Sequence, residues 1–573
     1  MLESEITITN KTMDLRDCKD AWFFDEKYQV WCLEDILYTD RATTPKFQRL
    51  SIFVPKEYMS APGVIDHQGQ HGAYRADEVP VIFENNSAGY MQMPHTYLGG
   101  PREFARQYLE EGFVYVTCGN RGHESKDATR KYVGKSPINL IDLKMGIRFL
   151  RHNAACIPGN LNKMISVGWS AGGAMSTLLA LTGDSENYRS LLEENGAFME
   201  ESDAVYAAQI YCPIIDLEHA DLAYEWMYHA DKENEESPAG HAGIMTPFEE
   251  AVSDKLYERY IRYFNGLKCK HPKTGEELVI GADGRSGNGY DYLMEKLSES
   301  AGIFLKKLSE HQAGQDYSVE DYLAGNYEEE KPAPMGNPDD KENAGKSDAM
   351  QGFAGPGVAM HKPVKQLEPP TLGDLVSRPP KGMPPMPEFK PPMIRVHGKE
   401  KAWLSWDGKN ARIRDLDTYV LQHRRRMKPC TSFDVWDGNS GENKVFGNES
   451  VNAVHFNADI AEILEELKDD FPAEYEKYSR AYQKVATEEG LAQRKYLINP
   501  LNYIHTKEVA KQAEYYRIRV GASDADTSAS VSMTLACKLA ESGKKVDYQF
   551  VWEQPHAEAD YPGEVIAWIR SIL

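Results

Sequence analysis

The chain has 573 residues, which is too long for one ordinary hydrophobic core and suggests two folded units or one unit with a large insertion. Its formal net charge of −23 argues against nucleic acid or an anionic membrane surface as the main partner, because both need a basic patch. No stretch approaches the ~18 consecutive apolar residues of a spanning helix, so we expect no membrane partner.

Short apolar runs alternate with amphipathic stretches from about residue 45 to 216. This alternation is typical of βαβ units and predicts a largely parallel sheet. The predicted strands are the apolar runs at residues 79–83, 113–118, 163–167 and 205–215.

Two helices are predicted between these strands. Ser136 and Pro137 read as an N-cap followed by proline at the first helical position, and apolar residues recur at helical spacing from Leu140 to Leu150. A second helix is predicted to begin near residue 174 and to run to 181.

The pattern changes after residue 216. Residues 217–500 are rich in charged residues and tyrosine, with helical patches at 248–264 and 458–468. Residues 327–392 hold 14 of the 31 prolines, a density that prevents regular helix or sheet. We interpret this stretch as a disordered linker, with an ordered strap over the substrate as the alternative.

Strand and helix patterns return at the C-terminus. Strands are predicted at 516–520 and 546–552, and helices at 530–539 and 563–572. The simplest architecture is an α/β core with a mostly parallel sheet, of the α/β-hydrolase kind, built from residues 1–216 and 501–573. Residues 217–500 are then a large inserted lid domain.

The motif Gly168-Trp169-Ser170-Ala171-Gly172 lies between a predicted strand and a predicted helix. This is the context of a nucleophile elbow, in which serine sits on a sharp turn and the flanking glycines let strand and helix approach closely. GxSxG by itself is a weak signal, but in this context we favour Ser170 as a nucleophile over a structural serine.

A serine nucleophile needs a base, and the base needs an orienting carboxylate. In this fold the chain order is serine, acid, histidine. Asp524 ends one predicted strand, and His556, the only histidine after Asp524, follows the next. We therefore predict Asp524 and His556 as the partners of Ser170, with a surface histidine as the alternative for His556.

The tetrahedral intermediate of acyl transfer needs two N–H donors. One is the backbone N–H of Ala171, the residue after the nucleophile. The other is expected from the loop at residues 85–90, where glycine permits close approach to the substrate carbonyl, so we choose Gly89 with Ala88 as the alternative.

Three segments together resemble the bacterial tannases, which are gallate-ester hydrolases with a large lid inserted in an α/β-hydrolase core. The segments are Gly168-Trp169-Ser170-Ala171-Gly172-Gly173-Ala174, Asn86-Ser87-Ala88-Gly89-Tyr90-Met91, and Asp524-Ala525-Asp526-Thr527-Ser528 through Pro555-His556. The likeness extends over most of the core and over residues 426–456 of the insertion.

In that family a lysine and a glutamate of the lid, with an aspartate two residues after the triad aspartate, contact the galloyl hydroxyls. The resemblance implies Lys428, Glu442 and Asp526 for these roles. Phenolic hydroxyls donate to carboxylates and accept from an ammonium group, so the chemistry fits. The alternatives are solvated charges for Lys428 and Glu442, and a helix cap near residue 527 for Asp526.

These observations lead to the hypothesis of a serine esterase, a tannin acyl hydrolase, that cleaves ester or depside bonds of gallate-like phenolic acids through an acyl-serine intermediate. A small phenolic ester is the expected partner, and no metal or organic cofactor is implied. The alternatives are a feruloyl or general carboxylesterase, a peptidase of the same fold, and a non-catalytic binding module.

The remaining expectations concern the redox state of the cysteines, the oligomeric state and the cellular location. The eight cysteines form no CxxC pair and read as reduced thiols, with one Cys18–Cys32 bridge as the alternative. We expect a monomer. The N-terminus lacks a basic region followed by an apolar run, so the protein is either cytoplasmic or secreted with its signal already trimmed.

Overall fold

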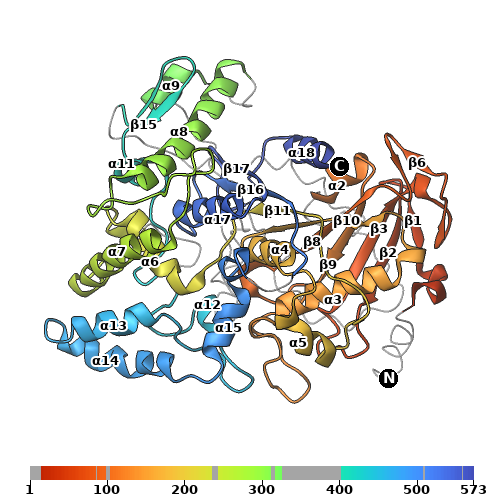
Figure 1. The fold of residues 1–573 in the computed structure, drawn as a ribbon, viewed down its shortest axis with the longest axis horizontal. Helices are drawn as coiled ribbons and strands as arrows, with labels where there is room; N and C mark the ends of the chain where they lie inside the picture. The colour runs from red at the N-terminus through yellow and green to blue at the C-terminus, as the bar shows by residue number, and fades with distance from the viewer. Residues whose placement is uncertain are drawn as a thin grey trace, which may run out of the picture.

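The computed structural model describes residues 14–573 except 86, 98–103, 235–242, 312–316, 326–401, 507–509 and 558. A nine-stranded sheet runs through the molecule (Figure 1). Its strands, in spatial order, are β1 (Phe23–Asp25), β2 (Val30–Leu37), β3 (Arg49–Pro55), β9 (Val114–Cys118), β8 (Pro80–Asn85), β10 (Asn160–Trp169), β11 (Ala207–Tyr211), β16 (Tyr515–Gly521) and β17 (Lys545–Val551).

The six strands from β9 to β17 are parallel, so the predicted α/β class with a mostly parallel sheet is confirmed. Every residue of β8, β9 and β11 is buried, because helices cover both faces. Helices α2 (Phe104–Glu110) and α18 (Glu564–Ile572) lie on one face, and α3 (Ile138–His152) and α4 (Ala171–Leu181) on the other (Figure 1). Helices α5 (Arg189–Glu194) and α17 (Ala529–Glu541) complete this part.

Three antiparallel strands extend the sheet at its N-terminal edge. Strands β1, β2 and β3 pair in antiparallel order, and β3 pairs with β9. The sequence analysis predicted none of these three strands. In β2 the reason is that the strand is only half buried and carries an irregularity between Leu33 and Ile36, which breaks the alternation of a regular strand.

Two local expectations need correction. Ser136 does not cap α3, which begins at Ile138, because its hydroxyl donates to the carbonyl of Arg494 at 2.8 Å. The apolar run at 205–215 is a strand only as far as Tyr211, since Cys212 has a positive φ of 34° and leaves the sheet. All eight cysteines are free, so the Cys18–Cys32 bridge does not form.

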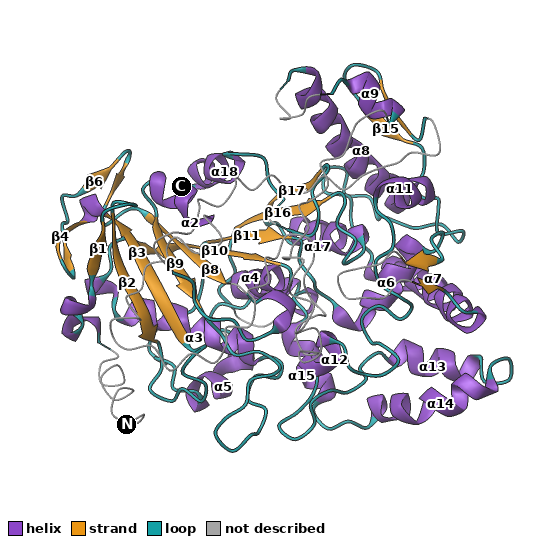
Figure 2. Cartoon of the chain, turned by 180° about the vertical axis from the view of Figure 1, so that it is seen from behind, coloured by secondary structure: helices purple, strands orange, loops and turns teal. Residues whose placement is uncertain are grey.

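The chain between β11 and β16 is mainly helical. Its helices are α6 (Leu217–Tyr228), α7 (Pro247–Leu267), α8 (Asn288–Ser309), α9 (Val319–Ala324), α11 (Leu416–His423), α12 (Gly441–Val445), α13 (Ala458–Glu466), α14 (Pro472–Tyr482), α15 (Leu491–Ile498) and α16 (Leu501–Ile504). Most of them gather at one side of the molecule, beyond β16 and β17, in both views (Figure 2). The proline-rich stretch 327–392 lies outside the described residues.

Four pairs of short strands form small hairpin sheets. They are β4 (Met59–Ala61) with β5 (Val64–Ile65), β6 (Gln70–His71) with β7 (Tyr74–Arg75), β12 (Glu233–Asn234) with β13 (Gly243–Ile244), and β14 (Leu404–Trp406) with β15 (Ala411–Ile413). Across the described residues, no helix combines the length and apolar character that a membrane crossing requires.

Candidate active site

Ser170 stands at the turn between β10 and α4. Its backbone has φ 59° and ψ −129°, a conformation that residues with side chains rarely adopt. The Ser170 N–H donates to the Tyr211 carbonyl at 3.1 Å, and the Ser170 carbonyl accepts from the Ile214 N–H at 3.2 Å. The end of the neighbouring strand therefore holds the strained turn in place.

The glycines around this turn are required by close backbone contacts. A Cβ atom on Gly168 would lie 2.3 Å from the carbonyl oxygen of Gly172, and one on Gly173 would lie 2.5 Å from that of Tyr211. A Cβ on Gly172 would lie 2.9 Å from Asn85 Oδ1 at the end of β8. Strand β10 and helix α4 can thus meet this closely only with glycine at these positions.

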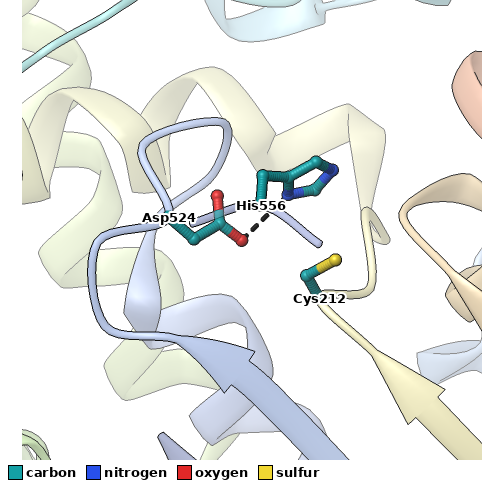
Figure 3. Close-up of side chains that lie close together, drawn as sticks. All are labelled: Cys212, Asp524 and His556. Carbon is teal, nitrogen blue, oxygen red and sulfur yellow. Dashed lines mark hydrogen bonds and ion pairs between the residues drawn. The ribbon is translucent and has the colours of Figure 1, made fainter. Parts of the chain in front are cut away.

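The structure brings Ser170, Asp524 and His556 together. His556 Nε2 lies 2.8 Å from Ser170 Oγ. On the other side of the ring, His556 Nδ1 lies 2.9 Å from Asp524 Oδ2, and Figure 3 shows these two side chains. Because a carboxylate only accepts, Nδ1–H donates to Asp524 and leaves the Nε2 lone pair facing the serine hydroxyl. This arrangement can move a proton from Ser170 to His556.

The loops that carry Asp524 and His556 are packed backbone against backbone. A Cβ atom on Gly521, at the end of β16, would lie 2.1 Å from the carbonyl oxygen of Gln554 in the loop after β17. The Ser523 N–H donates to that same carbonyl at 3.0 Å. These contacts fix the distance between the carboxylate and the imidazole.

The charges of His556 and Asp524 stabilise each other. Burial acts to lower the pKa of His556, but the Asp524 carboxylate outweighs it and raises this pKa well above the ordinary value. Burial acts to raise the pKa of Asp524, but His556 and the Arg424 guanidinium hold it below the ordinary value. The site therefore favours the imidazolium that forms when Ser170 loses its proton.

The two predicted N–H donors lie on segments next to Ser170. Ala171 opens α4, so its N–H has no acceptor within the helix. Gly89 lies in the short turn Ala88–Tyr90 with a left-handed φ of 59°, and this turn packs against the start of α4. The structure thus places the Ala88–Tyr90 turn next to the helix that begins at Ala171, and the role of these two N–H groups stays a prediction; Asn86 of the same loop lies outside the described residues.

Asp526 lies beside His556, and two further charged side chains, Lys428 and Glu442, lie near it. Asp526 Oδ2 is 3.9 Å from His556 Nδ1. Burial raises the pKa of Glu442, with Lys428 opposing and Asp526 adding to this shift, so all three groups lie within electrostatic reach of one another. The ammonium of Lys428 rests 4.0 Å above the ring centroid of Phe433.

Asp526 is the most informative of the three. Its Oδ2 atom is buried and has no hydrogen-bond partner in the described part of the chain. The alternative role as a helix cap is wrong, because the N-cap of α17 is Ser528, which accepts from the Ser530 N–H. A buried carboxylate oxygen without a donor costs stability and indicates a ligand group that supplies one.

Tyr224 of α6 is a residue that the sequence analysis missed. Its hydroxyl accepts from the N–H groups of Met427 and Lys428, both at 3.1 Å, and donates to the Ala525 carbonyl at 3.1 Å. It therefore fastens the segment with Lys428 to the loop with Asp526. No spacing in the sequence indicates this role, since a buried tyrosine in a helix is ordinary.

A buried pair of aspartates anchors the segment around Glu442. Asp221 accepts from the N–H groups of Ser432 and Phe433, both at 2.8 Å, and Asp434 accepts from Asn443 Nδ2 at 2.7 Å. Burial and the charge of Asp434 raise the pKa of Asp221 to about 6. The available signal was a charged residue on the buried face of a helix, which the sequence analysis did not use.

Cys212, directly after β11, lies beside the imidazole (Figure 3). Its Sγ contacts the Ala557 carbonyl at 3.4 Å. The possible ligand atoms of Cys212, Asp524 and His556 all lie within 4.8 Å of one another, the one such group of three among the described residues.

Comparison with known proteins agrees with this geometry. A family model described as BD-FAE matches residues 75–244. Tannin acyl hydrolase from Lactobacillus plantarum is 24% identical over 99% of both chains with a TM-score of 0.71. Tannase from Fusobacterium nucleatum is 26% identical over 95% of both chains with a TM-score of 0.67. No curated protein matches the chain.

A solved complex of tannin acyl hydrolase with ethyl gallate is also similar, at 24% identity and a TM-score of 0.68, over 95% of this chain and 94% of that one. These likenesses confirm the resemblance to bacterial tannases and the α/β-hydrolase fold. Together with the family model they support a carboxylic ester hydrolase.

Glu553 lies on the loop that carries His556 and has a positive φ of 59°. Its side chain is buried, accepts from the Tyr322 hydroxyl and lies 3.9 Å from His423 Nδ1. Burial raises the pKa of Glu553 to about 8. This carboxyl is therefore neutral in the folded protein at neutral pH.

We predict that Gly168→Ala disrupts the elbow. The new methyl group would overlap the Gly172 carbonyl, so β10 and α4 must move apart, and we expect kcat/KM to fall at least about 100-fold, as for a displacement of about 1 Å at a catalytic group. Gly266→Ala in α7 is the control, since its methyl meets no atom within 4 Å. Equal ester hydrolysis by the two variants would contradict the prediction.

We predict that Glu553→Gln flattens the pH dependence of stability. Between the ordinary pKa of 4.5 and about 8, the unfolded chain loses its Glu553 proton while the folded protein keeps it, so the free energy of unfolding falls as pH rises. The amide cannot ionise, and its advantage over glutamate should grow across this range to on the order of 4 kcal/mol. Urea unfolding at pH 5 to 8 measures this, with exposed Glu449→Gln as control. Parallel pH profiles for wild type and Glu553→Gln would refute it.

Proposed function

We propose that this carboxylic ester hydrolase cleaves ester and depside bonds of gallate-like phenolic acids through an acyl-serine intermediate. The observation that carries the proposal is the unpaired, buried carboxylate oxygen of Asp526 beside the hydrogen-bonded Ser170, His556 and Asp524. A hydroxylated aromatic acid supplies the missing donor at the point where its ester carbonyl reaches the serine.

The first half of the proposed reaction forms the acyl-serine. Ser170 Oγ attacks the ester carbonyl carbon while His556 Nε2 takes the hydroxyl proton. The N–H groups of Ala171 and Gly89 hold the oxyanion, and Asp524 stabilises the imidazolium. The C–O bond to the alcohol then breaks, and His556 gives its proton to the leaving oxygen.

The second half releases the acid. A water molecule attacks the acyl carbonyl carbon and gives its proton to His556 Nε2. The tetrahedral intermediate collapses with rupture of the bond to Ser170 Oγ, which takes the proton back from His556. Each proton taken by His556 is returned, so the residues named need no cofactor for this cycle.

The proposed acyl pocket combines two acceptors with one cation. Adjacent phenolic hydroxyls can donate to the carboxylates of Asp526 and Glu442, and one can accept from the Lys428 ammonium. An acid without these hydroxyls leaves the buried groups unpaired, which penalises its binding. We propose that this difference sets the preference for galloyl esters over feruloyl esters.

The proposed pocket lies between the core and the insertion. Asp526 follows strand β16 of the core, whereas Lys428 and Glu442 come from the segment between β11 and β16. Helix α12, which carries Glu442, contacts the turn Ala88–Tyr90 of the core. These contacts support residues 217–500 as a lid domain over a core formed by 1–216 and 501–573.

The rival functions differ from the proposed one in their substrate or in whether the protein catalyses a reaction at all. A feruloyl or general carboxylesterase would use the same triad with no need for the three charged groups. A peptidase would hydrolyse dipeptides, and a non-catalytic binding module would not need the Ser170–His556–Asp524 hydrogen bonds. A screen of methyl gallate, methyl ferulate and a dipeptide separates these, and we expect fastest hydrolysis of methyl gallate.

We predict that Ser170 is the residue acylated. A fluorescent organophosphonate should label the protein at Ser170. The Ser170→Ala variant should not be labelled, and its kcat should be at least about 10⁴-fold lower than that of the wild type. Ser309→Ala, at the exposed end of α8, should label and turn over like the wild type. Peptide mass spectrometry locates the adduct, and an adduct on any other serine would overturn the proposed mechanism.

We predict that Glu442→Gln lowers activity on gallate esters selectively. Loss of one charged acceptor should reduce kcat/KM for methyl gallate about 10- to 100-fold, while p-nitrophenyl acetate, which has no acyl hydroxyls, changes less than about threefold. Lys428→Ala should show the same selectivity.

The control is Glu449→Gln, a change of the same kind on the same segment. The Glu449 side chain is 70% exposed and pairs only with exposed Lys131 in the described structure, so both substrates should be hydrolysed at wild-type rates. Equal losses on both substrates in Glu442→Gln would refute the acyl pocket and leave a general esterase.

A further inference from the structure

The residues Cys212, Asp524 and His556 present a thiol, a carboxylate and an imidazole to one small volume (Figure 3). Their possible ligand atoms lie within 4.8 Å of one another. Sulfur, nitrogen and oxygen donors of this kind are the ligands of Zn²⁺ and related thiophilic cations. Ester hydrolysis as proposed above uses Asp524 and His556 but assigns no part to the thiol.

We propose that Cys212, Asp524 and His556 form a binding site for a thiophilic divalent cation such as Zn²⁺ or Cd²⁺, and that its occupation reversibly blocks the esterase. The inhibitory half of this inference rests on the proposed function, whereas the binding half does not.

The sheet holds the three ligands in neighbouring positions. Cys212 follows β11, Asp524 follows β16 and His556 follows β17, and these strands are adjacent, parallel and in register. The carboxyl ends of adjacent parallel strands meet at one edge, which places their loops side by side. The donor set therefore comes from three neighbouring loops at one edge of the sheet.

The position of the sulfur is also fixed locally. The Cys212 N–H donates to the Arg519 carbonyl of β16 at 2.8 Å, and the backbone turns there with a φ of 34°. This turn directs Sγ toward the loop of His556, where it meets the Ala557 carbonyl at 3.4 Å. Cys212 is fully buried, so its sulfur does not rotate out into solvent.

The distances allow coordination after a small movement. Zn–S and Zn–N bonds of about 2.3 and 2.0 Å place the ligand atoms of a tetrahedral site about 3.5 Å apart. The present separation of at most 4.8 Å thus closes with shifts of about 1 Å, within the reach of side-chain rotation. Three protein ligands leave a fourth position for water.

The charge balance suits a buried site. On binding, the Cys212 thiol releases one proton to solvent, and the imidazole proton of His556 moves from Nδ1 to Nε2. Thiolate and Asp524 carboxylate then carry two negative charges against the two positive charges of the cation. A neutral cluster avoids the cost of a net buried charge.

A cation bound in this way would block the proposed esterase reaction. With Nδ1 bound to the cation, His556 carries its proton on Nε2, the atom that faces Ser170 Oγ at 2.8 Å. The imidazole then has no lone pair for the serine proton. Attack on the ester stops until the cation is removed.

The first experiment measures binding on the full-length protein without using esterase activity. Cd²⁺ alone is titrated into metal-free protein, and the thiolate-to-cadmium absorbance in the ultraviolet is recorded. We expect a one-equivalent band in wild type, in Ser170→Ala and in Cys118→Ala, whose thiol is equally buried elsewhere in the core. The band should be absent in Cys212→Ala, and its persistence there would overturn the site.

The second experiment measures inhibition. Hydrolysis of p-nitrophenyl acetate is followed with increasing Zn²⁺ and then with EDTA, each variant being compared with its own metal-free rate. We expect reversible inhibition of wild type and Cys118→Ala. Cys212→Ala should need at least about tenfold more Zn²⁺, because loss of an outer-shell partner alone already costs that much.

The outcomes are separable. A cadmium band at Cys212 with no effect of Zn²⁺ on the rate would overturn the blocking step. Equal inhibition of wild type and Cys212→Ala would overturn the role of the thiol. If no ester is hydrolysed at all, the proposed function fails, and the band in Ser170→Ala still decides whether the cation site exists.

Discussion

The parallel pairing of β11 with β16 is the constraint on which the rest of the site depends. It joins Ala207–Tyr211 to residues 515–519, two segments that are about 300 positions apart in the chain. Ser170, Asp524 and His556 lie at the carboxyl ends of β10, β16 and β17, so a shift of register in this one ladder would separate Ser170 from Asp524. The hydrogen bond from the Cys212 N–H to the Arg519 carbonyl, at 2.8 Å, continues this register beyond the end of β11.

Helix α6 follows β11 directly and so connects the insertion to this sheet along the chain. Arg426 pairs with Glu225 of α6, and both side chains are fully buried. Removal of one partner of such a pair leaves a charge in a medium of low dielectric constant, at a cost of about 3–5 kcal/mol. The pair therefore holds the chain just before Lys428 at a defined position. Tyr224, one residue before Glu225, fixes the next two residues through its hydroxyl.

The fold and the triad residues could be predicted from the sequence because their signals are local. Fully buried parallel strands are continuous apolar runs, and the elbow at Ser170 places its glycines at fixed spacing in the chain. Asp524 and His556 follow from the order of residues in this type of fold. Their mutual hydrogen bond, by contrast, follows from the packing of Gly521 against the loop of His556, which no local pattern encodes.

The residues that the sequence analysis missed act through contacts between distant segments. Tyr224, Asp221 and Cys212 each contact a part of the chain at least 200 positions away. Side chains like those of Tyr224 and Cys212 are common in buried helices and at strand ends, so neither composition nor spacing distinguishes them, and Asp221 is marked only by its charge on the buried face of a helix. Lys428 and Glu442 were predicted only through the resemblance to a family, because a charged residue in a charged segment carries no signal of its own.

The proposed pocket illustrates how such a site balances stability against recognition. Asp526 Oδ2 is unpaired in the described structure, and Glu442 is buried with its ionised form disfavoured. Each costs the folded protein free energy that a hydrogen-bonded or apolar residue would not. A ligand with adjacent hydroxyls would offset this cost by forming hydrogen bonds to the two carboxyl groups. An apolar acid would remove more water from the same groups without forming hydrogen bonds to them. Under the proposed function, selectivity for a hydroxylated ring would follow from the unpaired oxygen of Asp526 and from the disfavoured buried charge of Glu442.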